Sequence, residues 1–300
     1  MMRNKTDLSA GLAGLDDVFQ GLRDGDNVVW QVDAVDQYNP VVCAFAEESL
    51  RRGRRVVYFR FATHEPLLEQ KEGLDVISLR PSDGFEVFVS LIHAEIVSGG
   101  RETVCIFDCL SELAADWCSD RMLGNFYMLI CPYIYDHSGA AYFSLLRNRH
   151  SFHATDPVRR TTQILVDLYR HDGKTYLHPQ KVLYRHTSTM FSLHVQSDTH
   201  FLPVTASSEI AEVFAHKRWN RLDSESWRQG YWSHLFARAE DAAAALERGE
   251  DPGEDVEVLT RQLCRMLIGR SGQVLALAET HLELTDLLAV RRRMIGTGLV

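Results

Sequence analysis

The chain reads NVVWQVD over Asn27–Asp33 and AFAEESLRRG over Ala44–Gly53. The first run is short, apolar and rich in β-branched residues, a pattern that predicts a buried strand. The second run mixes apolar and charged residues at helical spacing and stops at Gly53, which predicts a helix ended by that glycine. A buried strand followed by such a helix is the opening unit of a parallel α/β sheet.

The segment between this strand and helix is the place where a nucleotide-binding P-loop carries G-x-x-x-x-G-K-[ST]. In that motif glycines let backbone N–H groups approach phosphate, the lysine supplies charge and the Ser/Thr holds Mg²⁺. Ala34–Pro40 contains none of these residues. Asp33 and Asp36 would repel phosphate, and Pro40 fits the first turn of the helix, where it offers an anion no N–H. We expect no phosphate cradle at the degenerate positions, which are Asp33, Ala34, Asp36, Asn39 and Pro40.

The residues before the strand resemble the lead-in to the first strand of KaiC/RecA-like ATPases. Gly11–Asp16 has the order Gly-x-x-x-Leu-Asp, and Gly21–Gly25 has the order Gly-Leu-x-x-Gly that feeds into the Walker A strand of those proteins. The resemblance in order of elements covers about the first 185 residues, and close residue matching is confined to about the first 30. It implies a RecA/KaiC-like domain with a degenerate Walker A motif, that is, a pseudo-ATPase.

Two phrases, Gly25–Asp33 and Asp108–Leu113, are similar to the amino-terminal module of bacterial proteins of the phosphoenolpyruvate synthase and pyruvate phosphate dikinase type. This resemblance implies a parent phosphotransferase whose ATP, Mg²⁺ and pyruvate are handled downstream of residue 300. A phrase similar to Arg291–Val300 opens the ATP-grasp domain of those proteins. We therefore expect a fragment that ends before its catalytic part, with a frayed tail as the alternative.

Strands and helices alternate along the chain. We predict strands at 55–61, 75–79, 103–108 and 140–145, and helices at 85–97 and 113–137, the second with a break near Pro132. His171-Asp172-Gly173 lies between two β-prone runs, 161–170 and 174–181, and predicts an antiparallel hairpin. The expected fold is an α/β domain with a RecA/KaiC-like, mostly parallel sheet, helices on both faces and a C-terminal antiparallel hairpin, followed by a helical region.

Three parts are expected: a RecA/KaiC-like domain at residues 1–186, an extended linker at 187–205, and a helical connector at 206–300 that leads to a downstream ATP-grasp-like domain. The connector carries three apolar stripes at helical spacing. They contain Trp232, Leu235, Phe236, Ala239, Ala243 and Leu246, then Leu259, Leu263, Met266 and Leu267, then Val274, Leu277, Leu284 and Leu288. The first of these helices is expected to stop at Gly249.

Composition argues against several classes of function. The net charge is −9, and a nucleic-acid-binding surface needs clustered Lys and Arg for its phosphate contacts. No apolar run approaches the ~18–20 residues of a membrane span, and the first residues are too polar for a signal peptide. The six cysteines form no C-x-x-C pair and have no zinc-like spacing. We therefore expect reduced core cysteines, no metal site and a cytoplasmic protein.

Ligands of open α/β sheets bind beyond the carboxyl ends of the strands. The residues predicted there are Arg60, His64, Glu65, Asp108, Ser111, Glu112, Arg147, Arg149 and His150. Asp108 ends its strand as a Walker B acid does and would hold Mg²⁺ beside a triphosphate, or it caps the next helix or bonds loop amides. The glutamate that activates water in KaiC-like ATPases is missing, because Phe61-Ala62-Thr63 occupies its place. The cluster either receives an anionic metabolite or a partner loop, or its charges pair with each other.

Three functions are open. The first is a non-catalytic regulatory or interaction module of a phosphoenolpyruvate-synthase-like phosphotransferase, with no catalytic residue and no cofactor of its own. Its partners would be the downstream catalytic domain and a second copy of the chain. The second is an ATPase with an atypical nucleotide site and Asp108 on Mg²⁺. The third is a sensor that binds an anionic metabolite at the Arg/His cluster. The missing P-loop residues favour the first.

Overall fold

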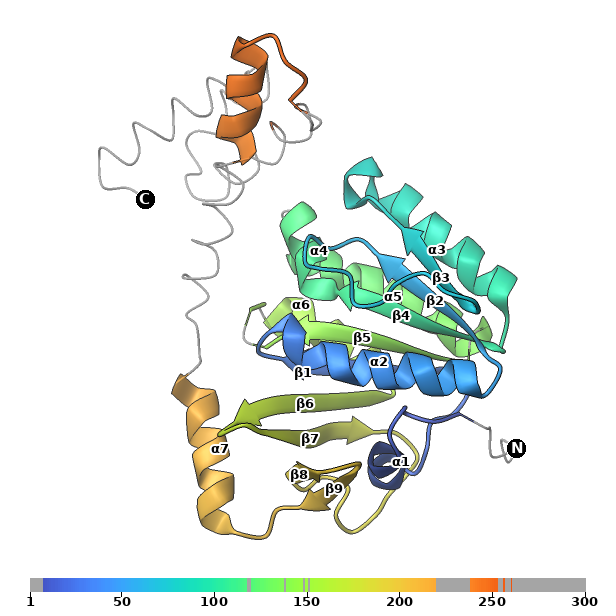
Figure 1. The fold of residues 1–300 in the computed structure, drawn as a ribbon, viewed down its shortest axis with the longest axis vertical. Coiled ribbons are helices and arrows are strands. Elements are labelled where there is room, and N and C mark those ends of the chain that lie inside the picture. Colours follow the sequence, from blue (N-terminus) through green and yellow to red (C-terminus); the bar gives the residue numbers. More distant parts are fainter. Residues whose placement is uncertain are drawn as a thin grey trace. The chain divides into compact units, whose positions relative to one another are not determined.

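The computed structural model describes residues 8–219, apart from 118, 119, 138, 148 and 151, together with residues 238–252, 256 and 260. The chain divides into two compact units, Met1–Leu222 and Asp223–Val300. The first unit is an α/β domain built on one nine-stranded sheet with helices packed against it (Figure 1). The predicted α/β class is confirmed.

The strands lie in the order β3-β2-β4-β5-β1-β6-β7-β8-β9. They are β1 Asp26–Val32, β2 Arg55–Arg60, β3 Leu74–Ser78, β4 Thr103–Cys109, β5 Ala140–Leu146, β6 Ile164–His171, β7 Lys174–Val182, β8 His194–Ser197 and β9 His200–Pro203. Neighbours from β3 to β6 are parallel, and those from β6 to β9 are antiparallel. The β6–β7 turn uses Asp172 and Gly173 at φ 47° and 73°, so the predicted hairpin is confirmed.

Strand side chains alternate between two layers that are rich in aromatic rings. The helices are α1 Ala13–Phe19, α2 Val35–Arg51, α3 Phe85–Gly99, α4 Leu110–Asp116, α5 Asp120–His137, α6 Phe152–Thr161 and α7 Ser207–Trp219, with a short 3₁₀ turn at Pro81–Asp83. On the face covered by α2, Phe45 stacks on Tyr142 with 3.9 Å between ring centroids. On the other face, Phe107 stacks on Phe143 at 4.4 Å, and Phe126 of α5 packs against Phe107.

The connection between β1 and α2 is much shorter than predicted. Only Asp33 and Ala34 link the two elements, because α2 begins at Val35 rather than at Ala44. Ala34 is the N-cap residue in an extended conformation (φ −147°, ψ 155°), and Pro40 lies inside the helix rather than in its first turn. A two-residue connection is too short to wrap around a phosphate group, so the backbone here differs from that of a P-loop.

The predicted linker at 187–205 is wrong. These residues contain β8 and β9, a hairpin whose first strand pairs with β7. Each strand is only four residues long, which explains why the sequence shows no clear periodicity there. Helix α7 then packs on the sheet through Val213, which clusters with Tyr169 and Tyr176. The first compact unit therefore extends well beyond the predicted boundary at residue 186.

The predicted long helix at 113–137 is two helices. Helix α4 ends at Asp116 and α5 begins at Asp120, whereas Pro132 lies within α5 without dividing it. Proline removes the hydrogen bond to the carbonyl four residues earlier, here that of Met128. The Met128 side chain is half-exposed, so water can reach this turn of the helix. Helices α1 and α6 were not predicted.

Close packing explains the glycines of the lead-in. Gly11 has φ 96°, a conformation that favours glycine. A Cβ atom on Gly14 would lie 2.6 Å from the Cα atom of His200 in β9. The Gly14 N–H also donates to the carbonyl oxygen of Thr199 at 3.1 Å. Gly14 therefore brings α1 directly against the β8–β9 hairpin, whereas Gly11 lies against the backbone of Ala44 and Phe45 in α2.

In the second unit, residues 238–247 are helical and Gly249 follows with φ 70°. Ala239 and Ala243 are buried, and Leu246 is half-exposed. This segment agrees with the predicted helix that stops at Gly249. The other predicted stripe residues and Arg291–Val300 lie outside the described residues. None of the helices in the described part of the chain is both long enough and apolar enough to cross a membrane.

Candidate functional site

Asp108 lies at the carboxyl end of β4, is fully buried, and accepts hydrogen bonds on both carboxylate oxygens. Its Oδ2 accepts from Arg60 Nη1 at 2.7 Å and from the backbone N–H groups of Phe61 and Ala62 at 2.8 Å each. Its Oδ1 accepts from the hydroxyl of Tyr58. Burial, and then the charge of Asp108, raise the pKa of Tyr58. The Asp108 carboxylate therefore bonds the amides of the loop after β2, one of the two roles expected of it.

Arg60 is held by the same loop. Besides its ion pair with Asp108, its guanidinium donates to the carbonyl oxygens of Ala62 and His64. The His64 ring places Nε2 3.7 Å from Asp108 Oδ1 and Nδ1 2.7 Å from the carbonyl oxygen of Glu65. The cation predicted to receive an anionic ligand is thus bonded to groups of its own chain.

Arg147 joins the carboxyl ends of β1, β5 and β6, and its side chain is only 5% exposed. Its Nη1 lies 3.0 Å from Asp33 Oδ1 and 3.2 Å from Oδ2. Its Nη2 donates to the carbonyl oxygen of Gln31 at 2.7 Å and to that of Leu168. The guanidinium carbon lies 4.0 Å above the ring centre of Tyr169, a cation–π contact. Asp33 and Arg147 therefore neutralise each other where a P-loop would hold phosphate.

Ser111 and His150 form a side-chain pair at the same edge of the sheet. Ser111 Oγ lies 2.7 Å from His150 Nε2 and accepts the N–H of Leu146 at 2.8 Å. A serine beside a histidine is the arrangement of nucleophilic catalysis. Here the serine is buried and bonds the end of β5, so the pair connects α4 to the loop after that strand.

The other residues at the degenerate Walker A positions make local contacts on α2. Asp36 lies 3.2 Å from Arg170 in an exposed ion pair. The side-chain oxygen of Asn39 accepts from Cys43 Sγ at 3.3 Å. Pro40 lines a pocket of about 50 Å³. That volume is far below the ~300–1,000 Å³ of typical ligand pockets.

The remaining predicted residues do not converge on one point. Glu65 is exposed, and Glu112 accepts a hydrogen bond from Thr63 Oγ1 at 3.2 Å. Arg149 is partly exposed, and the described residues provide no ion-pair partner for it. The structure therefore brings Arg60, His64 and Asp108 together in one cluster and places Arg147 in another. In each cluster the arginine pairs with a carboxylate of its own chain, Arg60 with Asp108 and Arg147 with Asp33.

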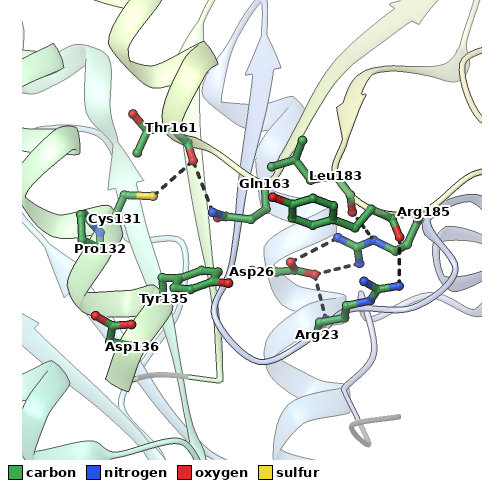
Figure 2. A pocket seen from close by; sticks show the side chains of 11 residues that line it. Arg23, Asp26, Cys131, Pro132, Tyr135, Asp136, Thr161, Gln163, Leu183 and Arg185 are labelled. Carbon is green, nitrogen blue, oxygen red and sulfur yellow. Dashed lines mark hydrogen bonds and ion pairs between the residues drawn. The ribbon is translucent and has the colours of Figure 1, made fainter. Parts of the chain in front are cut away.

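A larger cavity lies at the opposite, amino edge of the sheet (Figure 2), and has a volume of about 390 Å³. Its walls come from the residues before β1, from the last turns of α5, from the end of α6 and from residues 183–185 after β7. These segments meet because helices that run antiparallel to the strands end at the edge where the strands begin. Sequence reasoning missed this cavity because it considered only the carboxyl ends.

A buried ion pair forms one wall of this cavity. Arg185 Nη1 lies 2.8 Å from Asp26 Oδ2, and Nη2 lies 3.2 Å from Oδ1, with the two side chains 1% and 6% exposed. Arg185 also donates to the carbonyl oxygens of Gly21 at 2.7 Å and Leu183 at 3.2 Å. The backbone N–H of Arg23 donates to Asp26 Oδ2 at 2.8 Å. This network fixes the residues after β7 against the start of β1.

Polar groups also lie between β1 and β6 beside the cavity. Gln163 Oε1 accepts from the backbone and side-chain N–H groups of Asn27 at 3.0 and 2.9 Å. Burial raises the pKa of the Cys131 thiol to about 12, so this cavity-lining group stays protonated near neutral pH and is not a nucleophile. The available sequence signal was Asp26-Asn27, two adjacent polar residues at the start of a mostly apolar strand.

Within the described residues, no group of three or more His, Cys, Asp or Glu side chains is placed to hold a metal ion. No protein-family model matches the chain, and no curated protein matches its sequence.

Proposed function

We propose that the first unit is a non-catalytic regulatory or interaction module, a RecA/KaiC-like domain whose nucleotide position is closed by its own ion pairs. The observation that carries the proposal is that the Asp108 carboxylate already accepts hydrogen bonds from its own chain on both oxygens. A carboxylate oxygen has two lone pairs. Oδ2 of Asp108 already accepts three hydrogen bonds, and Oδ1 accepts one from Tyr58. A Walker B acid, in contrast, must be available to Mg²⁺.

The strand order supports the RecA-like part of the proposal. In RecA-like sheets one strand separates the strand before the Walker A position from the strand that ends at the Walker B acid. Here β5 lies between β1 and β4. Asp33 and Asp108 follow or end those strands at the same edge, as the resemblance requires.

The second support is the position of Arg147. Its guanidinium bonds the ends of β1 and β6 and pairs with Asp33, so positive charge is already present beneath the β1–α2 connection. A triphosphate would have to displace this internal pair without gaining the amides of a glycine-rich loop. The ATPase alternative is disfavoured for this reason. The metabolite-sensor alternative at the carboxyl edge is disfavoured too, since Arg60 and Arg147 are both engaged.

By resemblance, we propose that the module belongs to a phosphoenolpyruvate-synthase-like phosphotransferase whose ATP, Mg²⁺ and pyruvate are handled by a separate catalytic part. The module would then contact that catalytic part, a second copy of itself, or both. Light scattering of the purified chain over a range of concentrations tests the second contact. A strictly monomeric chain would restrict the proposal to contacts within the polypeptide.

Titration of the whole chain with Mg-ATP, followed by calorimetry and by phosphate release, tests the closed site. We expect no binding up to about 1 mM nucleotide, which corresponds to a binding free energy no better than about −4 kcal/mol. Asp108→Ala is the diagnostic variant, and Asp36→Ala is its control, because Asp36 is an exposed acid at the same edge. Micromolar binding that Asp108→Ala abolishes and Asp36→Ala preserves would refute the proposal.

A further inference from the structure

The amino-edge cavity has the size and the mixed lining of a small-molecule site. Its volume of about 390 Å³ falls in the range of ligand pockets, which combine apolar or aromatic walls with a few polar groups. Pro132 and Leu183 supply apolar surface, and Tyr135 and Tyr184 supply two aromatic rings. Figure 2 shows Pro132 and Tyr135 across the cavity from Arg23 and Arg185. This site is distinct from the closed nucleotide position and goes beyond the proposed function.

Tyr184 is held at the rim of the cavity by a strained backbone. It has φ 60°, in the left-handed region that a bulky residue rarely adopts, and its side chain is 85% exposed. The strain is maintained on both sides, because Arg23 Nη2 donates to the Tyr184 carbonyl oxygen at 3.3 Å and the next residue, Arg185, is locked to Asp26. Strain of this kind persists where the surroundings enforce it, and it concentrates at ligand sites.

The charges around the cavity select for one negative charge on a ligand. Asp26 and Arg185 cancel each other in their buried pair. Among the described residues the Arg23 side chain makes a single hydrogen bond, to Tyr184, so most of its five N–H donors are available. Asp136 also lines the cavity, but it is exposed, and Figure 2 shows its carboxylate farther from Arg23 than the Tyr135 ring. A carboxylate matches the planar fork of one guanidinium, whereas the second charge of a phosphate dianion would find the other lining arginine, Arg185, already paired with Asp26.

We propose that this cavity binds a small planar aromatic monocarboxylate, with the carboxylate on Arg23 and the ring between Tyr135 and Tyr184. The ring would stack on Tyr135 and Tyr184, and covering the exposed Tyr184 ring would add apolar burial to the aromatic contact.

The test uses three probes that share one scaffold, titrated into the whole chain by calorimetry and ligand-detected NMR. The probes are 2-naphthoate, its uncharged analogue 2-naphthamide, and the dianionic 2-naphthyl phosphate. We expect 2-naphthoate to bind at least about tenfold more tightly than either analogue. Hydrogen bonds between its carboxylate and the Arg23 guanidinium account for a difference of that size. No binding of 2-naphthoate at millimolar concentration, or tighter binding of the phosphate, would overturn the proposal.

Two variants and a control locate the bound probe. Arg23→Gln should lower the affinity for 2-naphthoate by about tenfold or more and leave the affinity for 2-naphthamide unchanged. Tyr184→Gly should retain or raise the melting temperature, because glycine accepts φ 60°, while it weakens both probes through loss of the ring. Arg170→Gln changes an exposed side chain at the opposite edge of the sheet and should leave the affinity for both probes unchanged. Equal loss of binding in Arg23→Gln and Arg170→Gln would show non-specific charge attraction and refute the site.

Discussion

Replacing Arg185 by methionine leaves the carboxylate of Asp26 in a buried position without its cation. The two side chains are 1% and 6% exposed, so water does not compensate for the loss. Breaking a buried pair in this way costs about 3–5 kcal/mol, against a typical domain stability of about 5–15 kcal/mol. For a unit of this size, 1 kcal/mol shifts the melting temperature by about 2–4 °C, so Arg185→Met should lower it by roughly 6–20 °C.

The assay is thermal and urea unfolding followed by circular dichroism, with two companion variants. Arg170→Met removes an exposed pair with Asp36 and should cost less than about 1 kcal/mol. The double variant Asp26→Asn/Arg185→Met removes the stranded charge and should be no less stable than Arg185→Met alone. If Arg185→Met costs no more than Arg170→Met, or if the double variant is less stable than Arg185→Met alone, the pair does not hold the residues after β7 to the start of β1 as argued.

Three further outcomes follow from local geometry. Hydrogen bonding from Arg51 lowers the pKa of Glu48 to about 2, so its stabilisation is complete above about pH 4.5 and is lost as pH falls toward 2. Glu48→Gln should therefore lower the melting temperature near neutral pH and have no effect near pH 2. Gly14→Ala should destabilise by about 1–3 kcal/mol, because its Cβ would meet β9 at 2.6 Å, and a rise in melting temperature would contradict this packing. Tyr58→Phe strands the buried N–H of Leu67 and should cost about 1–3 kcal/mol in urea unfolding.

The central strands were predictable because their local apolar composition is enough to indicate burial. β1, β2, β4 and β5 are mostly apolar runs because helices cover both faces of the sheet there, and such runs can be recognised without knowing which strands are their neighbours. The start of α2 was also encoded locally. Gln37 stands three residues after the N-cap Ala34, and its side-chain oxygen accepts the N–H of Asp33 at 3.1 Å. This bond resembles one half of a capping box, but Ala34 is not a capping residue, so the local signal for a helix start at Val35 is weak.

The candidate site was not predictable in the same way. The residues at the carboxyl edge were placed correctly near the strand ends, yet their partners depend on the register between distant strands. Arg60 meets Asp108 because β2 pairs with β4, and Arg147 meets Asp33 because β5 pairs with β1. No local pattern distinguishes an arginine that faces a ligand from one that faces a carboxylate of its own chain. The amino-edge cavity likewise needs four segments to meet before it exists.

The central position of β1 in the sheet also means that, during translation, this strand is made long before either of its neighbouring strands. Asp26 pairs with Ala140 in β5, and Val28 pairs with Ile164 in β6. At about 5–20 residues per second, residue 140 emerges from a ribosome roughly 6–23 s after residue 26. Throughout that interval a strand whose every residue is buried in the folded chain has no native neighbour. The nascent polypeptide is therefore open to wrong pairing for seconds at its first strand, and chaperones that shield Asp26–Val32 would raise the yield of folded protein.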